Sequence, residues 1–235
     1  FDLKSLKACI SGGAPLPVEV KKSFEKNTGC VVVEGYGLTE ASPVVTLNPL
    51  HGKRKPGSIG LPLAKHIKLR IVDEQEHILP IEQIGELIVQ GPNVMAGYLN
   101  QREATEQTIR EGWLYTGDMA KIDADGYVYI VGRKKEMINV RGLNVYPLEI
   151  EETLYLNPKI KECAVIGIPD THKGEVPKGF IVLQEGEAAT EQEILHYLRQ
   201  RIAAYKIPKH IEFRPTLPKN ATGKILKRVL ADEEN

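Results

Sequence analysis

The chain has 235 residues, room for one or two domains, and its 31 lysines and arginines balance its 31 aspartates and glutamates. A net charge of zero argues against extended nucleic-acid binding, which needs a basic stripe. No apolar run approaches the ~20 residues of a membrane-spanning helix, and no signal peptide is visible.

The three cysteines, Cys9, Cys30 and Cys163, are scattered, and no pair has metal-ligand spacing. We therefore expect small buried thiols in a reducing compartment, with no disulfide framework. The chain opens on Phe1-Asp2-Leu3 without an initiator methionine, and we expect it to be a piece of a longer protein.

The first predicted unit is a strand, a helix and a second strand. Residues 6–10 and 30–34 are short apolar runs on either side of a predicted helix over 17–27. This order favours a piece of parallel sheet, and its glycines follow the strand ends, where such sheets bind ligands.

From about Gly57 to Ile130, short strands alternate with Gly and Pro turns, which predicts a small β-rich subdomain. Asp125-Gly126 is a hairpin signal, and one helix is predicted over 103–111. We leave Lys53-Arg54-Lys55 as a solvated loop without a partner. The predicted strands are 68–72, 85–90, 113–115, 120–122 and 127–131.

After Gly132 the pattern becomes α+β, so we predict domains over 1–131 and 132–235. Pro147 suits the first position of a helix over 148–156, and Thr190 with Glu193 forms a capping box before a helix over 194–204. The predicted strands are 163–168, 179–184 and 210–214. Thr222-Gly223-Lys224 is predicted to open the last helix.

Five short motifs carry the candidate chemistry. Alone, each is typical of an ordinary turn or solvated loop, except that the seven-residue run around Tyr36 favours function slightly. In this order they indicate a split nucleotide site that ends in a lysine on a glycine turn. The motifs are Ser11-Gly12-Gly13-Ala14-Pro15, Tyr36-Gly37-Leu38-Thr39-Glu40, Tyr115-Thr116-Gly117-Asp118, Gly132-Arg133-Lys134-Lys135-Glu136 and Thr222-Gly223-Lys224.

Joining a carboxylate to the α-phosphate of ATP requires an adenosine slot, a metal ligand and a movable cation. Tyr36 lies between two glycines and can present its ring to adenine, while Glu40 offers a hard oxygen to Mg²⁺. The Asp118 carboxylate can accept from ribose hydroxyls, and Arg133 carries a fork of donors for ribose or phosphate oxygens. Lys224 could reach a phosphate.

Together these motifs resemble the adenylate-forming family, which contains acyl-CoA synthetases, peptide-synthetase adenylation domains and firefly luciferase. Gly85-Glu86-Leu87, Gly97-Tyr98-Leu99 and residues 141–151 also fit that family. The resemblance implies α/β and α+β architecture: a remnant of the large domain, made of a β-α-β piece and the β-rich subdomain, followed by a small α+β domain. The family's Ser/Thr/Gly-rich phosphate loop does not occur in these residues.

The resemblance also implies roles for individual residues. Thr39 would contact phosphate and Glu40 would hold Mg²⁺, while Asp118 and Arg133 would hold ribose. Lys135 would be the hinge and Lys224 the adenylation lysine. The adenosine slot would be lined by Gly13, Ala14, Glu34, Gly35 and Tyr36, and the loop approaching coenzyme A would contain Arg141 and Gly142.

The implied function is ATP-dependent ligation of a carboxylic acid to coenzyme A, and the chain looks most like a medium- or long-chain fatty acyl-CoA synthetase. Asn139 stands where luciferase has lysine, which argues against luciferase-type oxidation. Two alternatives stay open: an aryl or short-chain acid–CoA ligase, and a non-catalytic nucleotide-binding scaffold. We expect a cytoplasmic parent, with peripheral membrane association left open, and a fragment inactive by itself. The sequence indicates no oligomeric state.

Overall fold

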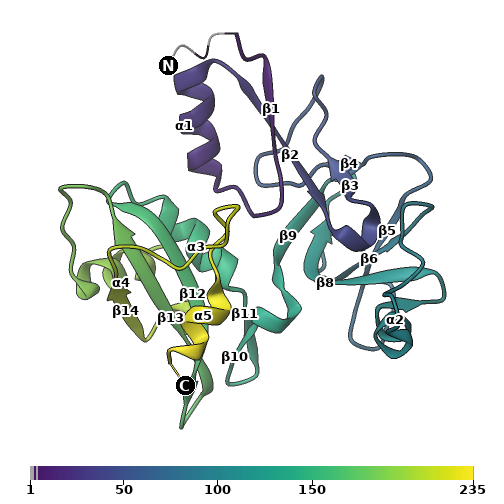
Figure 1. The fold of residues 1–235 in the computed structure, drawn as a ribbon. Coiled ribbons are helices and arrows are strands. Elements are labelled where there is room, and N and C mark those ends of the chain that lie inside the picture. The colour runs from purple at the N-terminus through teal and green to yellow at the C-terminus, as the bar shows by residue number, and fades with distance from the viewer. Residues whose placement is uncertain (1–2, 4, 235) are drawn as a thin grey trace. The chain divides into compact units, whose positions relative to one another are not determined.

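The computed structural model describes residue 3 and residues 5–234, and the chain divides into two compact units, Phe1–Lys134 and Lys135–Asn235 (Figure 1). The mixed architecture confirms the predicted fold class. We placed the domain boundary after residue 131, which lies inside strand β9 (Val128–Arg133). The two compact units meet three residues later, between Lys134 and Lys135.

The first unit begins with the predicted strand–helix–strand piece. Strands β1 (Ala8–Ser11) and β2 (Val31–Gly37) pair in parallel across helix α1 (Val18–Thr28). The helix ends at Gly29, whose φ of 70° is the left-handed conformation that glycine adopts at little cost. Strands β3 (Val44–Leu47) and β4 (Leu61–Pro62), which the sequence did not predict, complete a sheet of order β1-β2-β3-β4.

Gly37 closes β2 where the backbone doubles back. A Cβ at this position would lie 1.9 Å from the Pro43 carbonyl oxygen, so only glycine fits. The Leu38 N–H donates to the same oxygen at 2.8 Å. This tight closure presents the short 3₁₀ helix Thr39–Ala41 at the end of the strand.

The predicted β-rich subdomain is an antiparallel sheet. Its order is β5-β6-β8-β7, with β9 on the other side of β8. Helix α2 ends at Thr108 because the chain then pairs with the sheet as β7, where Ile109 lies opposite Leu114. The bounds are β5 Lys68–Val72, β6 Gly85–Gln90, α2 Arg102–Thr108, β7 Ile109–Arg110 and β8 Trp113–Ile122.

Strand β8 is one continuous strand where we predicted two, over 113–115 and 120–122. The intervening Thr116-Gly117-Asp118 segment reads as a turn in sequence, but the backbone passes through it with Gly117 at φ 70° and shifts of register nearby. Such a bulge redirects side chains without ending the strand.

The Lys53-Arg54-Lys55 loop has partners, contrary to our expectation. Lys55 forms ion pairs with Asp123 and Asp125, and the Lys53 Nζ lies 2.8 Å from Asp125 Oδ2. Both carboxylates come from the predicted Asp125-Gly126 hairpin between β8 and β9. The sequence could not reveal these pairs because the partners lie far apart along the chain.

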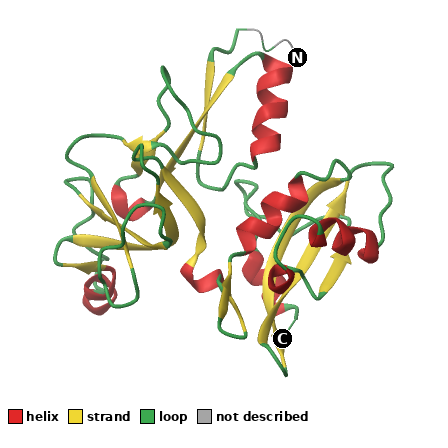
Figure 2. Ribbon diagram, turned by 180° about the vertical axis from the view of Figure 1, so that it is seen from behind, coloured by secondary structure: helices red, strands yellow, loops and turns green. Residues whose placement is uncertain are grey.

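The second unit is a sheet covered by helices (Figure 2). Its order is β11-β10-β13-β12, and β14 runs parallel to β13. The Thr190–Glu193 capping box forms as predicted, but α4 ends at Arg199 instead of residue 204. The bounds are β10 Ile138–Val140, β11 Leu143–Val145, α3 Pro147–Tyr155, β12 Ile160–Asp170, β13 Gly174–Leu183, α4 Glu191–Arg199, β14 His210–Phe213 and α5 Lys227–Asp232.

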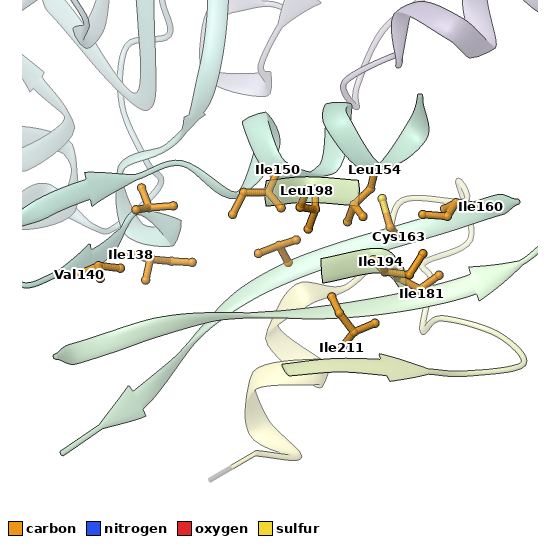
Figure 3. Close-up of a cluster of buried hydrophobic side chains, with 12 residues drawn as sticks. Ile138, Val140, Ile150, Leu154, Ile160, Cys163, Ile181, Ile194, Leu198 and Ile211 are labelled. Atoms are coloured by element: carbon orange, nitrogen blue, oxygen red, sulfur yellow. The ribbon is translucent and has the colours of Figure 1, made fainter. Parts of the chain in front are cut away.

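Alternating residues of β12 and β13 supply two separate cores. Cys163, Val165 and Ile181 pack with Ile150, Leu154, Ile194 and Leu198 of α3 and α4 (Figure 3). Ala164, Ile166, Phe180 and Val182 pack with Leu230 of α5 in the other core. Since successive side chains of a strand point to opposite faces, both faces of this sheet are buried.

Helix α5 begins at Lys227, so the prediction that Thr222-Gly223-Lys224 opens the last helix is wrong. A bridge between Lys219 and Ile225 closes residues 220–224 into a loop, and the Leu226 N–H donates to the Pro218 carbonyl. None of the described helices is long and apolar enough to cross a membrane.

Leu154→Ala should lower the free energy of unfolding of the second unit by about 2–5 kcal/mol, because it leaves a cavity at a fully buried position. Hydrogen exchange of the β12 and β13 amides measures this loss directly. The matched control is Leu156→Ala, whose side chain is 52% exposed and which should change little. Equal exchange in both variants would contradict the assigned core.

Candidate functional site

Three of the predicted site residues gather around one buried carboxylate. Asp118 on β8 is 4% exposed and lies opposite Arg133 of β9. The Tyr36 hydroxyl donates to Asp118 Oδ2 at 2.6 Å, and the Arg133 Nε lies 2.9 Å from Asp118 Oδ1. Burial, and then the neighbouring Asp118 charge, raise the pKa of Tyr36, so its hydroxyl stays a neutral donor. Residues far apart in sequence thus form one polar cluster.

The bulged segment of β8 that carries Asp118 is fixed by Glu86 and Thr116. The Gly117 N–H donates to Glu86 Oε1 at 3.1 Å, and the Asp118 N–H donates to the Thr116 hydroxyl at 3.1 Å. The other oxygen of Glu86 accepts from Lys134 Nζ at 2.8 Å. Sequence reasoning quoted Glu86 within a family motif but gave it no role; a Glu directly before the apolar run 87–89 was the available signal.

Glu40 is half-buried on a polar groove of about 290 Å³ in the first unit. The Tyr98 hydroxyl donates to Glu40 Oε1 at 2.8 Å, and the Met95 N–H donates to the Glu40 carbonyl at 2.8 Å. The groove is also lined by Thr116 and Lys134, while the neighbouring Thr39 is exposed. One held carboxylate beside a hydroxyl suits a hard cation that keeps water and phosphate oxygens as its other ligands.

The residues predicted to line an adenosine slot lie at the ends of β1 and β2. Gly13 follows β1 with a φ of 84°, just ahead of Ala14, and a Cβ on Gly12 would lie 3.3 Å from the Gly35 carbonyl oxygen. The Glu34 carboxylate accepts from Lys21 Nζ of α1 at 2.8 Å, and both side chains are buried. The Glu34 side chain therefore anchors helix α1 to the sheet.

Lys224 lies exposed on the loop before α5, and Asn220 organises that loop. Asn220 Oδ1 accepts from the Lys224 N–H at 2.9 Å and from the Thr222 N–H at 3.0 Å. Gly223 has a φ of 84°, which suits glycine. Sequence reasoning gave Asn220 no role, although asparagine side chains commonly accept from the backbone N–H two residues on.

Arg141 and Gly142 form the two-residue turn between β10 and β11. Both have positive φ, 54° and 83°, which is the backbone of a tight hairpin turn and is strained for arginine. The Gly142 N–H donates to Asn139 Oδ1 at 2.7 Å, and the Arg141 N–H donates to the Lys173 carbonyl at 3.0 Å. Both residues are exposed, so the turn presents the guanidinium on a fixed backbone.

A cavity of about 380 Å³ in the second unit escaped sequence reasoning. Lys173, Arg199 and Lys209 line it together with Tyr205, so three cations and one aromatic ring share a largely apolar hollow. Lys209 also lies 2.9 Å from Asp170, and this lysine and nearby backbone N–H groups hold the pKa of Asp170 at about 2. The Ala204–Lys206 3₁₀ helix and the following Pro208 bring Tyr205 and Lys209 together.

The three cysteines are free thiols, and Cys30 and Cys163 are buried. Burial, followed by the nearby Glu151 charge, raises the pKa of Cys163 well above its usual value. A thiol held in its protonated form is a poor nucleophile, which supports its interpretation as a small core residue.

Comparison with known proteins finds matches for both units of the chain. Residues 1–99 match the model of the AMP-binding enzyme family, and residues 149–224 match the model of the AMP-binding enzyme C-terminal domain. The long-chain-fatty-acid–CoA ligase of Bacillus subtilis strain 168 is 50% identical over 234 residues, which are 100% of this chain and 42% of the ligase.

Two solved structures have the same fold. ATP-bound MatB from Rhodopseudomonas palustris matches with a TM-score of 0.91 at 39% identity, over 95% of this chain and 44% of that one. The anthranilate CoA ligase AuaEII in complex with anthranoyl-AMP matches with a TM-score of 0.92 at 36% identity, over 100% of this chain and 46% of that one. The chain thus spans less than half the length of the relatives it matches, and it belongs to the family of AMP-binding, adenylate-forming enzymes.

Proposed function

We propose that this chain is the C-terminal part of an AMP-forming acyl-CoA ligase whose substrate is a fatty acid. The observation that carries the proposal is the Tyr36–Asp118–Arg133 cluster, a set of polar side chains assembled from three strands of the first unit. Long-chain-fatty-acid–CoA ligase is also the activity of the 50% identical relative. The reaction is R-COO⁻ + MgATP → acyl-AMP + PPi, then acyl-AMP + coenzyme A → acyl-CoA + AMP.

The nucleotide would be held by the first unit. Asp118 would accept from the ribose hydroxyls, and its contacts with Tyr36 and Arg133 fix the direction of its carboxylate. The Tyr36 ring, anchored through its hydroxyl, would lie against the adenine, beside the backbone of Gly13, Ala14 and Gly35. Arg133, with a side chain 43% exposed, keeps donors for nucleotide oxygens.

The groove beside Glu40 would hold Mg²⁺ and the phosphates. Glu40 supplies one carboxylate already oriented by Tyr98, and the exposed Thr39 precedes it in the chain. Bound Mg²⁺ would neutralise phosphate charge, and it commonly takes one or two carboxylates plus phosphate oxygens. Lys134 on the rim of the groove adds a positive charge.

The second unit would supply the mobile groups. Lys224, presented on the Asn220 loop, would bridge the substrate carboxylate and the α-phosphate during adenylation. Lys135 would act as the hinge, and Arg141 with Gly142 would face coenzyme A during thioester formation. The cavity lined by Lys173, Arg199 and Lys209 suits a polyanion, and coenzyme A is the anionic co-substrate of this reaction.

A second candidate is an aryl-acid–CoA ligase, favoured by the likeness to the anthranilate CoA ligase. The two candidates share every step and differ in the acid. The test supplies the full-length protein with ATP, Mg²⁺, coenzyme A and a panel of fatty and aryl acids, and measures acyl-CoA and AMP. We expect turnover with a fatty acid. Failure to form acyl-CoA from any acid would overturn the proposal.

In the same assay, this chain alone should form no acyl-CoA above background. Holding the acid against the α-phosphorus is worth about 7–11 kcal/mol of barrier, and we expect most of the acyl pocket upstream. Turnover by the chain near the full-length rate would show that the site is misplaced.

Asp118→Asn should weaken AMP binding by this chain about tenfold, because charge-assisted hydrogen bonds are the stronger ones. Titration calorimetry measures the affinity, and circular dichroism checks that the variant is folded. The control is Asp125→Asn, in the same unit and with a side chain 51% exposed. Unchanged AMP affinity in Asp118→Asn would remove Asp118 from the site.

Lys224→Ala in the full-length protein should slow ATP–pyrophosphate exchange about 10²–10³-fold with ATP binding roughly intact, because it removes a cation that stabilises developing charge. The control is Lys219→Ala, a lysine at the base of the same loop that pairs with Glu162. Near-normal exchange in Lys224→Ala would contradict the assignment.

Lys135→Pro should reduce thioester formation at least about tenfold more than adenylate formation, because proline fixes φ and a hinge must change it. Single-turnover measurement of each half-reaction separates the two effects. Equal losses in both would indicate a folding defect instead of a hinge.

A further inference from the structure

The residues on either side of Lys135 are each tied to a different unit. The chain passes from the first unit to the second between Lys134 and Lys135, within the 3₁₀ helix Lys134–Glu136. Lys134 pairs with Glu86 of the first unit, and Glu136 pairs with Lys227 of the second. Among the described residues, Lys135 itself has no ion-pair partner and its side chain is exposed.

The ion pair of Lys134 with Glu86 lies next to the proposed nucleotide site. Glu86 lies on β6, its side chain is 11% exposed, and its two oxygens accept from Lys134 Nζ and the Gly117 N–H. The Glu86 carboxylate therefore holds both the backbone of β8 just before Asp118 and Lys134, the last residue of the first unit. Movement of Lys134 away from the first unit would leave a nearly buried carboxylate without its cation, which is costly.

The ion pair of Glu136 connects it to Lys227, the first residue of the helix that follows the Lys224 loop. Lys227, the first residue of α5, lies 3.4 Å from Glu136 Oε2 and 2.7 Å from Glu151 Oε1. Glu151 is buried on α3 and also accepts from the Val165 N–H at 2.7 Å. Lys227 is thus fixed inside the second unit, and Glu136 is fixed to Lys227.

We propose that the Glu86–Lys134 and Glu136–Lys227 ion pairs confine the hinge rotation to Lys135 and so act as positioning pairs for the second half-reaction. The inference rests on the proposed function. With both neighbours held in their own units, a change of pose has to be absorbed by the backbone of one residue. The pairs also link that residue to the candidate functional groups, because Glu86 accepts from the Gly117 N–H and Lys227 begins the helix that follows the Lys224 loop.

The test asks whether removing both pairs lets neighbouring residues take over the rotation. The full-length protein is compared in four forms: unchanged, Lys135→Pro, Lys134→Met with Glu136→Gln, and all three substitutions together. Both flanking substitutions leave the buried partners otherwise bonded, since Glu86 keeps Gly117 and Lys227 keeps Glu151. Single-turnover rates of adenylate and thioester formation are measured for each form.

For each background we take the ratio of the thioester-formation rates without and with Lys135→Pro. We expect this ratio to be roughly threefold smaller when both pairs are absent than when they are present. If the two ion pairs only stabilised the fold, the variant with all three substitutions would form thioester more slowly than Lys135→Pro alone. A faster rate in that variant therefore indicates a role in confining the hinge. The control replaces ion pairs away from the hinge, by Lys121→Met with Glu212→Gln, and should give no rescue.

If Lys135→Pro reduced thioester formation equally with and without the two pairs, in a protein that forms acyl-CoA, this inference would be overturned and the proposed function would stand. Rescue by the control substitutions would also overturn it, because loss of any surface pair would then loosen the protein. If the unchanged protein formed no acyl-CoA, the proposed function would fail and this inference with it.

Discussion

The candidate site of the first unit is organised around one buried carboxylate, that of Asp118. A charge removed from water is tolerated only with close donors, and Asp118 recruits them from the ends of two other strands. Tyr36 reaches it from the sheet that contains the β-α-β piece, and Arg133 reaches it across the β8–β9 ladder. The same contacts that make burial of the charge tolerable bring a ring, a carboxylate and a guanidinium together.

The sequence predicted those elements whose signals are local. The strands over 68–72 and 85–90 and the Thr190–Glu193 cap depend on nearby residues and were found where expected. The short strands β3, β4, β7, β10 and β11 have two to four residues each, too few for an alternating pattern to stand out. The course of β8 was also hidden, because Gly117 signals a turn locally while pairing with β6 and β9 keeps the strand extended.

For the site, sequence reasoning identified residue types and their order but not their partners. Tyr36, Asp118 and Arg133 were each expected near the nucleotide, yet their convergence on one carboxylate appears only in three dimensions. Glu34 was also expected near the nucleotide, but its carboxylate pairs with Lys21 of the neighbouring helix. The cationic cavity of the second unit draws its residues from four separate segments, none of which carries a motif. The wrong start of α5 has a similar origin: a glycine turn before a helix resembles a helix start until Asn220 is seen to close it into a loop.

The turn between β10 and β11 bears on how this protein can change over evolutionary time. Arg141 occupies a left-handed backbone position that glycine or asparagine would fill with less strain, at a cost on the order of 1 kcal/mol or more. Selection for stability alone would therefore replace the arginine. Any function that offsets this cost would act through the exposed guanidinium of Arg141. Laboratory evolution for heat resistance alone would consequently favour glycine or asparagine at this position.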